Sequence, residues 1–201
     1  MSASPTRVVL ASSNAGKLRE FSELLAEQGF QLSRQSDFGI TPPPETGSTF
    51  LENALIKARN AARITGLPAI ADDSGIEVDA LQGAPGVHSA RYAGEDASDA
   101  ANLSKLLAAL VGKSSVERRA RYRCVIVYVE HADDPRPLIG EGTWEGGIIE
   151  AQRGDGGFGY DPSFVPTGDT RTVAEMPLAE KNQQSHRAKA LNAFLAQFSR
   201  R

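Results

Sequence analysis

The stretch Arg7-Val8-Val9-Leu10-Ala11-Ser12-Ser13-Asn14-Ala15-Gly16-Lys17 decides the fold class of this chain. Four apolar residues follow Arg7, and two of them are β-branched valines, which is typical of a short buried strand. Small and polar residues then predict a turn, and apolar residues recur at helical spacing from Leu18 to Leu25, before Gly29. The opening of the chain therefore predicts a strand–loop–helix unit, as found in α/β proteins.

Predicted helices and strands continue to alternate after this unit. Thr49 and Glu52 form a capping box at the start of a long apolar stripe that ends at Gly66, which predicts a helix. The patterns predict further strands over 68–71, 76–81, 121–130, 138–149 and 163–165, and further helices over 98–110 and 185–198. We therefore expect an α/β fold, a two-lobed single domain over residues 1–201 with a central mixed β-sheet flanked by helices. A change of character near residue 111 is expected to separate the lobes, with an active-site cleft between them.

Length, charge and cysteine content exclude several classes of protein. The chain has 201 residues, a formal net charge of −3 and a single cysteine, Cys124. One cysteine excludes a disulfide framework and a zinc cluster built on thiolates, and the slight acidity gives no net attraction to long nucleic acids. No apolar run is long enough for a membrane span, and the run near the N-terminus is too short for a secretory leader. We therefore expect a cytoplasmic protein that has neither a membrane nor a long nucleic acid as its partner.

The first polar cluster, residues 12–17, lies between the first predicted strand and the first predicted helix. Backbone N–H groups at a helix N-terminus, together with the charge of Lys17, suit a phosphate group. The pattern is not a Walker A loop, because Ala11 stands at the place of the first glycine and Leu18 at that of the Ser/Thr. A capped helix with a surface lysine is the alternative interpretation.

The second cluster consists of three carboxylates. Glu45 lies in a proline-rich segment, and Asp72 and Asp73 directly follow an apolar run. Adjacent carboxylates at the end of a buried strand are costly unless they are paired or bind a cation. Neighbours on an extended backbone point to opposite faces, so the two aspartates are expected to have different roles. An all-oxygen donor set favours Mg²⁺ or Mn²⁺ over zinc, and solvated acids in an Asp-Ser-Gly turn are the alternative.

Two further clusters lie in the last quarter of the chain. Residues 154–161 form a glycine-rich loop in which Phe158 or Tyr160 can stack on a base, although a hairpin loop with packed aromatics is the alternative. Lys181 and Arg187 lie six positions apart and cannot face one ligand from a single helix. If they converge, a helix starts near Ser185 and Lys181 lies in the preceding loop; an ordinary basic helix start is the alternative. A metal-bound nucleotide explains all four clusters at once.

Several long motifs, in the correct order, resemble the non-canonical purine nucleoside triphosphate pyrophosphatase family (inosine/xanthosine triphosphatases). The resemblance covers nearly the whole chain, from Val8 to about Phe198. Ser12-Ser13 stands where many relatives have Thr-Gly, and Ser12 keeps the hydroxyl. The stretches that carry the resemblance are residues 10–17, Glu45-Thr46-Gly47, Thr49-Phe50-Leu51-Glu52-Asn53-Ala54, Lys57-Ala58-Arg59, Ala71-Asp72-Asp73-Ser74-Gly75, Pro85-Gly86-Val87-His88-Ser89-Ala90-Arg91-Tyr92, Gly156-Gly157-Phe158-Gly159-Tyr160-Asp161-Pro162, Lys181 and Ser185-His186-Arg187.

The resemblance implies a homodimer that cleaves a nucleoside triphosphate to its monophosphate and pyrophosphate with the help of Mg²⁺, for which Mn²⁺ is expected to substitute. The implied substrates are inosine and xanthosine triphosphates and their deoxy forms, so that the enzyme cleanses the nucleotide pool of deaminated purines. On this hypothesis residues 12–17, Lys57 and Lys181 hold the triphosphate, and Glu45 and Asp73 bind the metal. Asp73, or Asp72 beside it, helps to deprotonate the attacking water.

The same hypothesis assigns the remaining candidate residues to substrate binding. Phe158 stacks on the purine, Gly159, Tyr160 and Asp161 shape the pocket, and Ser74 contacts the substrate. His186 and Arg187 can donate to O6 of a deaminated purine. Arginine never accepts from the amino group of adenine, and histidine does so only in the other tautomer, so these donors favour deaminated bases.

Three other functions compete with this one. A pyrophosphatase for pyrimidine or modified nucleotides, such as the Maf-like septum-inhibition proteins, would have a similar architecture, but Ser185-His186-Arg187 favours a purine. A nucleotide-binding sensor would bind without turnover, but the paired Asp72 and Asp73 favour chemistry. A DNA-repair protein that acts on inosine within a strand is the least supported, because the chain lacks a broad basic surface.

Overall fold

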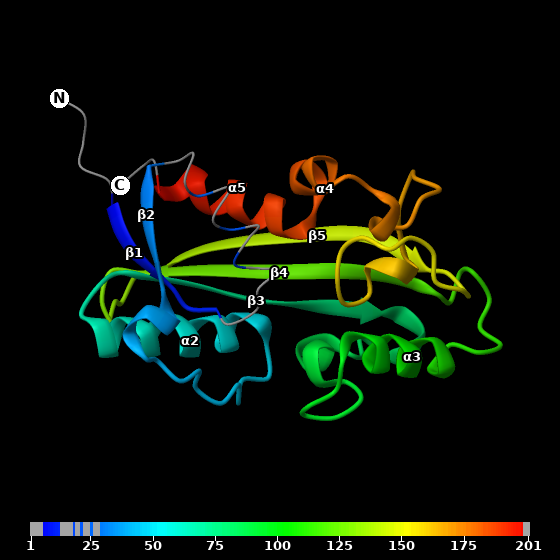
Figure 1. Cartoon of the computed structure of the whole chain (residues 1–201), viewed down its shortest axis with the longest axis horizontal. Coiled ribbons are helices and arrows are strands. Elements are labelled where there is room, and N and C mark those ends of the chain that lie inside the picture. The colour runs from blue at the N-terminus through cyan, green and yellow to red at the C-terminus, as the bar shows by residue number, and fades with distance from the viewer. Residues whose placement is uncertain (1–5, 13–17, 19–20, 22–24, 26–28, 199–201) are drawn as a thin grey trace. The chain divides into compact units, whose positions relative to one another are not determined.

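The computed structural model describes residues 6–12, 18, 21, 25 and 29–198 (Figure 1). In this part of the chain six strands form one sheet in the order β2-β1-β3-β4-β5-β6. β1 is parallel to β2 and β3, whereas β6 is antiparallel to β5, so the predicted mixed sheet is confirmed. The elements are β1 (Thr6–Leu10), β2 (Phe30–Arg34), α2 (Phe50–Thr65), β3 (Ala69–Val78), α3 (Asp99–Ala109), β4 (Arg119–Val129), β5 (Leu138–Ile148), β6 (Phe164–Pro166), α4 (Leu178–Gln184) and α5 (His186–Phe198).

The chain folds as two compact units. Unit 1 comprises Met1–Asp73, Val125–Gly140 and Leu191–Arg201, and unit 2 comprises Ser74–Cys124 and Glu141–Ala190. The boundary predicted near residue 111 is wrong, because that residue lies within unit 2. The division depends on contacts between segments that are distant in sequence, and β3, β4, β5 and α5 each begin in one unit and end in the other. A local change in amino-acid composition carries no information about such contacts.

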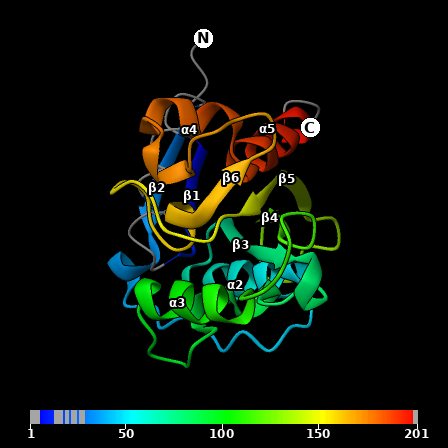
Figure 2. The same ribbon diagram turned by 90° about the vertical axis from the view of Figure 1, so that its right-hand side faces the viewer.

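Unit 1 has its core around β1. Val8 and Val9 are completely buried, and α2 contributes small, equally buried side chains such as Ala54 and Ala58. These alanines let the helix lie close to the sheet, and the end of α5 covers the opposite face (Figures 1 and 2). The predicted capping box of α2 is confirmed, because Thr49 Oγ1 accepts a hydrogen bond from Glu52 N at 3.2 Å and Glu52 Oε2 accepts one from Thr49 N at 3.0 Å.

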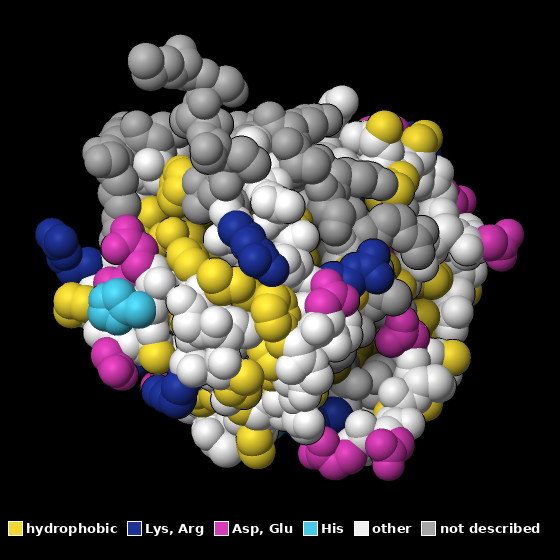
Figure 3. All heavy atoms as spheres, turned by 60° about the vertical axis from the view of Figure 1, so that its left-hand side comes forward, with side chains coloured by type: hydrophobic (Ala, Val, Ile, Leu, Met, Phe, Trp, Pro, Cys, Tyr) yellow, Lys and Arg dark blue, Asp and Glu magenta, His cyan; other side chains and the backbone are white. Residues whose placement is uncertain are grey.

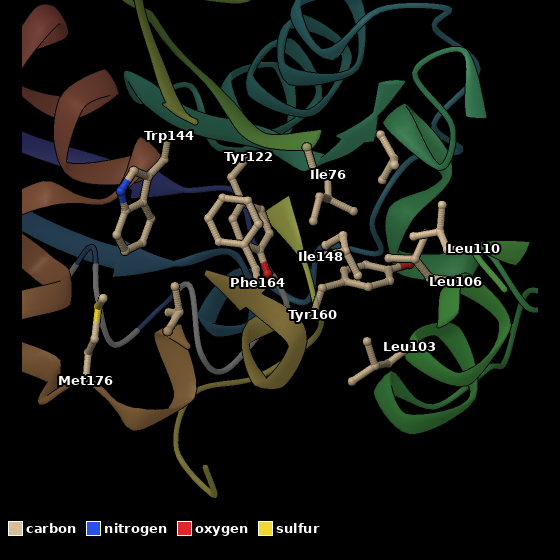
Figure 4. Packing of buried hydrophobic residues seen from close by; sticks show 13 residues of the cluster. Ile76, Leu103, Leu106, Leu110, Tyr122, Trp144, Ile148, Tyr160, Phe164 and Met176 are labelled. Atoms are coloured by element: carbon tan, nitrogen blue, oxygen red, sulfur yellow. The ribbon is translucent and has the colours of Figure 1, made fainter. Parts of the chain in front are cut away.

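Unit 2 has a separate hydrophobic cluster, shown in Figure 4. Tyr122 and Phe164 lie at its centre, with Trp144 on one side and the leucines of α3 on the other. In this unit α3 covers one face of the sheet, and α4 and the start of α5 cover the other (Figures 1 and 2). The predicted helix at 98–110 is confirmed as α3, whose N-cap Ser98 accepts a hydrogen bond from Ala101 N at 3.2 Å.

β3 differs from its prediction. It is one continuous strand of ten residues, whereas the sequence predicted two short strands with Asp72-Asp73-Ser74-Gly75 between them. β3 lies between β1 and β4, so the sheet ladder satisfies its backbone and the polar residues need no turn. Residues 79–81, predicted as part of a strand, form a 3₁₀ helix instead.

Several other elements were missed or misplaced. β2 has a half-polar sequence at the edge of the sheet, and no element was predicted there. A 3₁₀ helix at Gly86–Arg91 lies where no helix or strand was predicted. Lys181 lies in the short helix α4 and not in a loop. The helix predicted from Leu18 lies mostly outside the described residues.

Charges of both signs occur on the surface. On the face drawn in Figure 3, the described lysines and arginines stand apart from one another, with acidic side chains between some of them. None of the helices in the described ranges is long and apolar enough to cross a lipid bilayer.

Candidate active site

A carboxylate–lysine cluster lies in unit 1. Lys57, on α2, places its Nζ 3.0 Å from Oε1 of Glu45 and 3.0 Å from Oδ1 of Asp73. The side chains of Lys57 and Asp73 are only 12% and 7% exposed, and that of Glu45 is 26% exposed. The structure thus brings together three of the predicted residues from a proline-rich segment, a helix and a strand that are separate in the sequence.

Asn53 is a site residue that the sequence analysis missed. Its Nδ2 donates to Oδ2 of Asp73 at 3.3 Å, and its Oδ1 accepts from the backbone N of Gly47 at 2.8 Å. The side chain therefore fixes Asp73 and, at the same time, the segment that carries Glu45. Its position four residues before Lys57, on the same face of α2, is the signal that could have revealed it.

The electrostatics of the cluster centre on Lys57. Burial lowers the pKa of its amino group, but the negative charges of Asp73, Asp72 and Glu45 together outweigh burial and raise this pKa above its usual 10.5. Lys57 is therefore fully charged at neutral pH. Successive side chains of a strand point to opposite faces, so Asp72 points away from the face of β3 on which Asp73 meets α2. That the two aspartates have different roles stays a prediction.

Glu45 and Asp73 are the residues that fit a divalent metal. One oxygen of each lies 3.0 Å from the same Lys57 nitrogen, so the two oxygens are at most twice that distance apart. Within the described residues, no group of three or more His, Cys, Asp and Glu side chains is arranged to enclose a metal. Mg²⁺ commonly binds through one or two carboxylates and completes its coordination with water and substrate phosphates, and a pair of carboxylates fits that habit.

A second cluster lies in unit 2 around Asp161. Its Oδ2 accepts from Lys181 Nζ at 2.9 Å and from the backbone N of Phe158 at 3.0 Å, and its Oδ1 accepts from the hydroxyl of Tyr122 at 3.0 Å. The side chains of Lys181 and Asp161 are each only 5% exposed. Three donors compensate the buried carboxylate, and Asp161 in turn fixes the turn that presents Phe158.

Arg187 and Lys181 converge on Phe158. Lys181 Nζ lies 4.5 Å from the centre of the Phe158 ring, and Arg187 Cζ lies 5.8 Å from it. Arg187 Nη2 also donates to Oγ of Ser74 at 3.3 Å. Lys181 and Arg187 lie on different helices, because α4 ends before Ser185 and α5 starts after it. Ser185 marks the start of α5, and its Oγ accepts a hydrogen bond from Ala188 N at 3.2 Å.

His186 and Tyr160 occupy different surroundings. The His186 imidazole is buried and stacks on Tyr122, with ring centres 4.6 Å apart and an angle of 8° between the planes. Tyr160 belongs to the hydrophobic cluster, and its hydroxyl donates to the carbonyl of Ser89 at 2.8 Å. Gly159 donates its backbone N–H to Oδ2 of Asp99 at 2.8 Å. Tyr160 and Gly159 therefore anchor the glycine-rich loop.

Only Ser12 of the predicted phosphate-binding loop is described. It lies just after β1 and is half-buried. The other members of the loop, Ser13, Asn14, Ala15, Gly16 and Lys17, lie outside the described residues.

Comparison with known proteins decides the family. Residues 8–197 match the Ham1 family. The chain belongs to the Ham1 family. Among its relatives are two proteins named dITP/XTP pyrophosphatase, from Vibrio parahaemolyticus and Thioalkalivibrio sulfidiphilus. The first is 54% identical and the match covers 96% of each chain; the second is 58% identical, over 94% of this chain and 96% of the relative.

Solved structures of Ham1 proteins have the same fold. The HAM1 protein from Coxiella burnetii matches with a TM-score of 0.90 and 47% identity, over 98% of this chain and 100% of that chain. A nucleoside-triphosphatase / dITP/XTP pyrophosphatase from Mycobacterium abscessus matches with a TM-score of 0.76 and 42% identity, over 94% and 97% of the two chains. The resemblance stated from the sequence motifs is therefore confirmed.

Proposed function

We propose that this Ham1 protein is a nucleoside triphosphate pyrophosphatase that hydrolyses deaminated purine nucleotides, dITP, ITP, dXTP and XTP, to the monophosphate and pyrophosphate. The relatives named dITP/XTP pyrophosphatase support this activity, since the match covers nearly the whole of both chains. The structural observation that carries the proposal is the largely buried Glu45–Lys57–Asp73 cluster. Such a cluster combines a cation for phosphate oxygens with carboxylates for a metal and a proton.

The triphosphate is held by cations. Lys57 keeps its positive charge at neutral pH and can donate to phosphate oxygens, together with residues 12–17 and Lys181. Glu45 and Asp73 would hold Mg²⁺, or Mn²⁺ in its place, and the metal when bound would neutralise negative charge on the phosphates. Electrostatic stabilisation of this kind supplies most of the barrier reduction in phosphoryl transfer.

The carboxylate of Asp73 is the base we assign to the attacking water. The water oxygen forms a bond to the α-phosphorus, its proton passes to the carboxylate, and the bond from the α-phosphorus to the bridging oxygen breaks as pyrophosphate leaves. Lys57 and Asn53 orient the two oxygens of Asp73 for this task. Asp72 is the alternative base that the sequence leaves open, because it is the neighbour of Asp73, although its side chain points to the opposite face of the strand.

The polar cluster around Asp161 in unit 2 selects the nucleobase. Arg187 has only donors, and His186 can donate, so O6 of a deaminated purine satisfies them. Adenine presents an amino group there, and each buried donor left without an acceptor costs about 1–3 kcal/mol. Phe158 stacks on the purine.

The remaining predictions complete the proposal. We propose that the enzyme is a homodimer, that it acts in the cytoplasm, and that residues 1–201 form one functional domain. Size-exclusion chromatography with light scattering measures the oligomeric state directly, and a monomeric mass at micromolar concentration would contradict the dimer.

A substrate panel tests the function. The purified full chain is incubated with Mg²⁺ and dITP, XTP, dATP, dGTP, dCTP, dTTP or a modified pyrimidine triphosphate, and both products are identified. We expect monophosphate and pyrophosphate in equal amounts, with dITP and XTP as the fastest substrates. Fastest turnover of a pyrimidine triphosphate would favour the Maf-like alternative, and binding without turnover would favour a sensor.

A further inference from the structure

Tyr122 connects His186 with Asp161 in the polar cluster of unit 2. It lies on β4, its ring stacks on the imidazole of His186, and its hydroxyl donates to Asp161. We propose that Tyr122 is a positioning residue for purine recognition, which sets the plane of the His186 imidazole and thereby the direction of its N–H donor. This inference rests on the proposed function and adds to it a residue that determines specificity without touching the base.

The ring contact fixes an otherwise soft torsion. Rotation about the Cβ–Cγ bond of histidine has broad minima, so packing decides the plane of the ring. The Tyr122 and His186 rings are nearly parallel, at 8°, with centres 4.6 Å apart, and both side chains are buried. A hydrogen bond weakens steeply when its angle falls below about 120°, so a pivoting imidazole would lose contact with O6 while its backbone stayed in place.

The backbone of His186 is fixed independently of this contact. A Cβ at Gly142 of β5 would collide with the carbonyl oxygen of His186 and lie 2.5 Å from the nitrogen of Ala190, so the first turn of α5 lies directly against the strand. Gly142 therefore lets the backbone of His186 lie directly against β5, and Tyr122 determines how the side chain is turned. The two constraints are separable by mutation.

The hydroxyl of Tyr122 links the same ring to the Phe158 loop. It donates to Oδ1 of Asp161 at 3.0 Å, while Oδ2 of Asp161 holds Lys181 and the backbone of Phe158. Burial, together with the negative charge of Asp161, raises the pKa of the Tyr122 hydroxyl well above 10.0, so it stays protonated and remains a donor at every working pH. Tyr122 itself is held by an edge contact with Phe164, at 4.7 Å between ring centres (Figure 4).

The test is a set of substitutions on one strand. Tyr122→Met removes the ring but keeps most of the volume, and Tyr122→Phe keeps the ring but removes the hydroxyl. Tyr128→Met is the matched control, because Tyr128 is a buried tyrosine of the same strand whose ring contacts Phe194 and Phe198 instead. For each protein, kcat and KM are measured with dITP and with dATP, and thermal unfolding confirms that the variant is folded.

We expect Tyr122→Met to raise KM for dITP about tenfold, with kcat within about threefold, and to lower the dITP/dATP ratio of kcat/KM by about tenfold. Tyr122→Phe is expected to keep that ratio within about twofold, because the stacked ring remains. Tyr128→Met is expected to lose stability with the ratio unchanged.

The inference is overturned if Tyr122→Met keeps the ratio of the wild type, or if Tyr128→Met lowers it equally. Should Tyr122→Met fail to fold, Tyr122→Leu takes its place, because it also removes the ring; a tenfold fall in its ratio would support the role of stacking, and an unchanged ratio would overturn it. A wild-type enzyme without preference for dITP over dATP would instead refute the proposed function, and the two failures are thus distinguishable.

Discussion

Replacing Asp73 by asparagine removes one negative charge from β3 and keeps the shape of the side chain. Oδ1 of Asp73 lies 3.0 Å from Lys57 Nζ, and at an effective dielectric constant of about 20 two unit charges at that distance interact by about 5 kcal/mol. Glu45 lies equally close to Lys57 and remains, so the lysine stays paired. We therefore expect the free energy of unfolding to fall by about 1–3 kcal/mol, less than the 3–5 kcal/mol typical of a buried charge left without its partner.

We expect Asp73→Asn to lose most of its activity even where it stays folded. Asparagine cannot take the proton of the attacking water and is a weaker metal ligand, and mutations of such groups cost about 100-fold or more, which is about 2.7 kcal/mol in the barrier. Pyrophosphate release from dITP at saturating Mg²⁺ measures kcat, and urea unfolding measures stability. Asp79→Asn is the matched control, because Asp79 lies 2.8 Å from Arg121 in an ion pair on the surface.

We expect Asp79→Asn to retain the activity of the wild type. If Asp73→Asn released pyrophosphate within about threefold of the wild-type rate, the assignment of Asp73 to the metal and the proton would be wrong. Asp72→Asn would then be the next variant to examine, since Asp72 is the alternative base.

Three further outcomes are expected. Arg187→Ala should lower the ratio of dITP to dATP turnover by about tenfold or more, because a donor that discriminates against adenine is lost; an unchanged ratio would contradict the O6 interpretation. Glu45→Gln should raise the Mg²⁺ concentration for half-maximal activity by about tenfold, and chelation of Mg²⁺ should stop the wild-type enzyme; an unaltered Mg²⁺ titration would remove Glu45 from the metal site. The folded-state pKa of Lys57 lies above its usual 10.5, so its contribution to stability is complete below that pH and is lost as pH rises through the folded-state value. Urea unfolding between about pH 9 and 11.5 should therefore show a steeper alkaline loss of stability in the wild type than in Lys57→Met, and parallel curves would refute the pairing.

The elements that the sequence predicted best are those with strong local signals. The capping box at Thr49 and Glu52 and the apolar stripe behind it identified α2, and Ser98 with its spaced leucines identified α3. Such signals involve residues at most four positions apart, so they can be recognised in the sequence before the fold is known. β2 lacked a comparable signal, because an edge strand with a half-polar sequence owes its conformation to its neighbour β1.

The sequence predicted the residues of the candidate site more fully than the contacts between them. Residue types indicated that Glu45 and Asp73 suit a divalent metal, and the family resemblance added Lys57 as a residue that holds the triphosphate. Asn53 and Tyr122 were missed because each acts by holding another residue: Asn53 bridges Asp73 to the Gly47 segment, and Tyr122 supports His186 and Asp161. A side chain whose role is to hold a neighbour has no chemical signature of its own in a sequence.

The sequence by itself determined the α/β class, the main helices, the kinds of side chain available for chemistry and the family to which they belong. Tertiary structure alone decided that Asp73 and not Asp72 meets Lys57, that Lys181 and Arg187 lie on two helices, and that Tyr122 stacks on His186. The physical reason is the distance along the chain over which each interaction acts. Helical periodicity and capping act over a few residues, whereas the meeting of Glu45 with Asp73, or of Tyr122 with His186, depends on strand order and on which face of the sheet each helix covers.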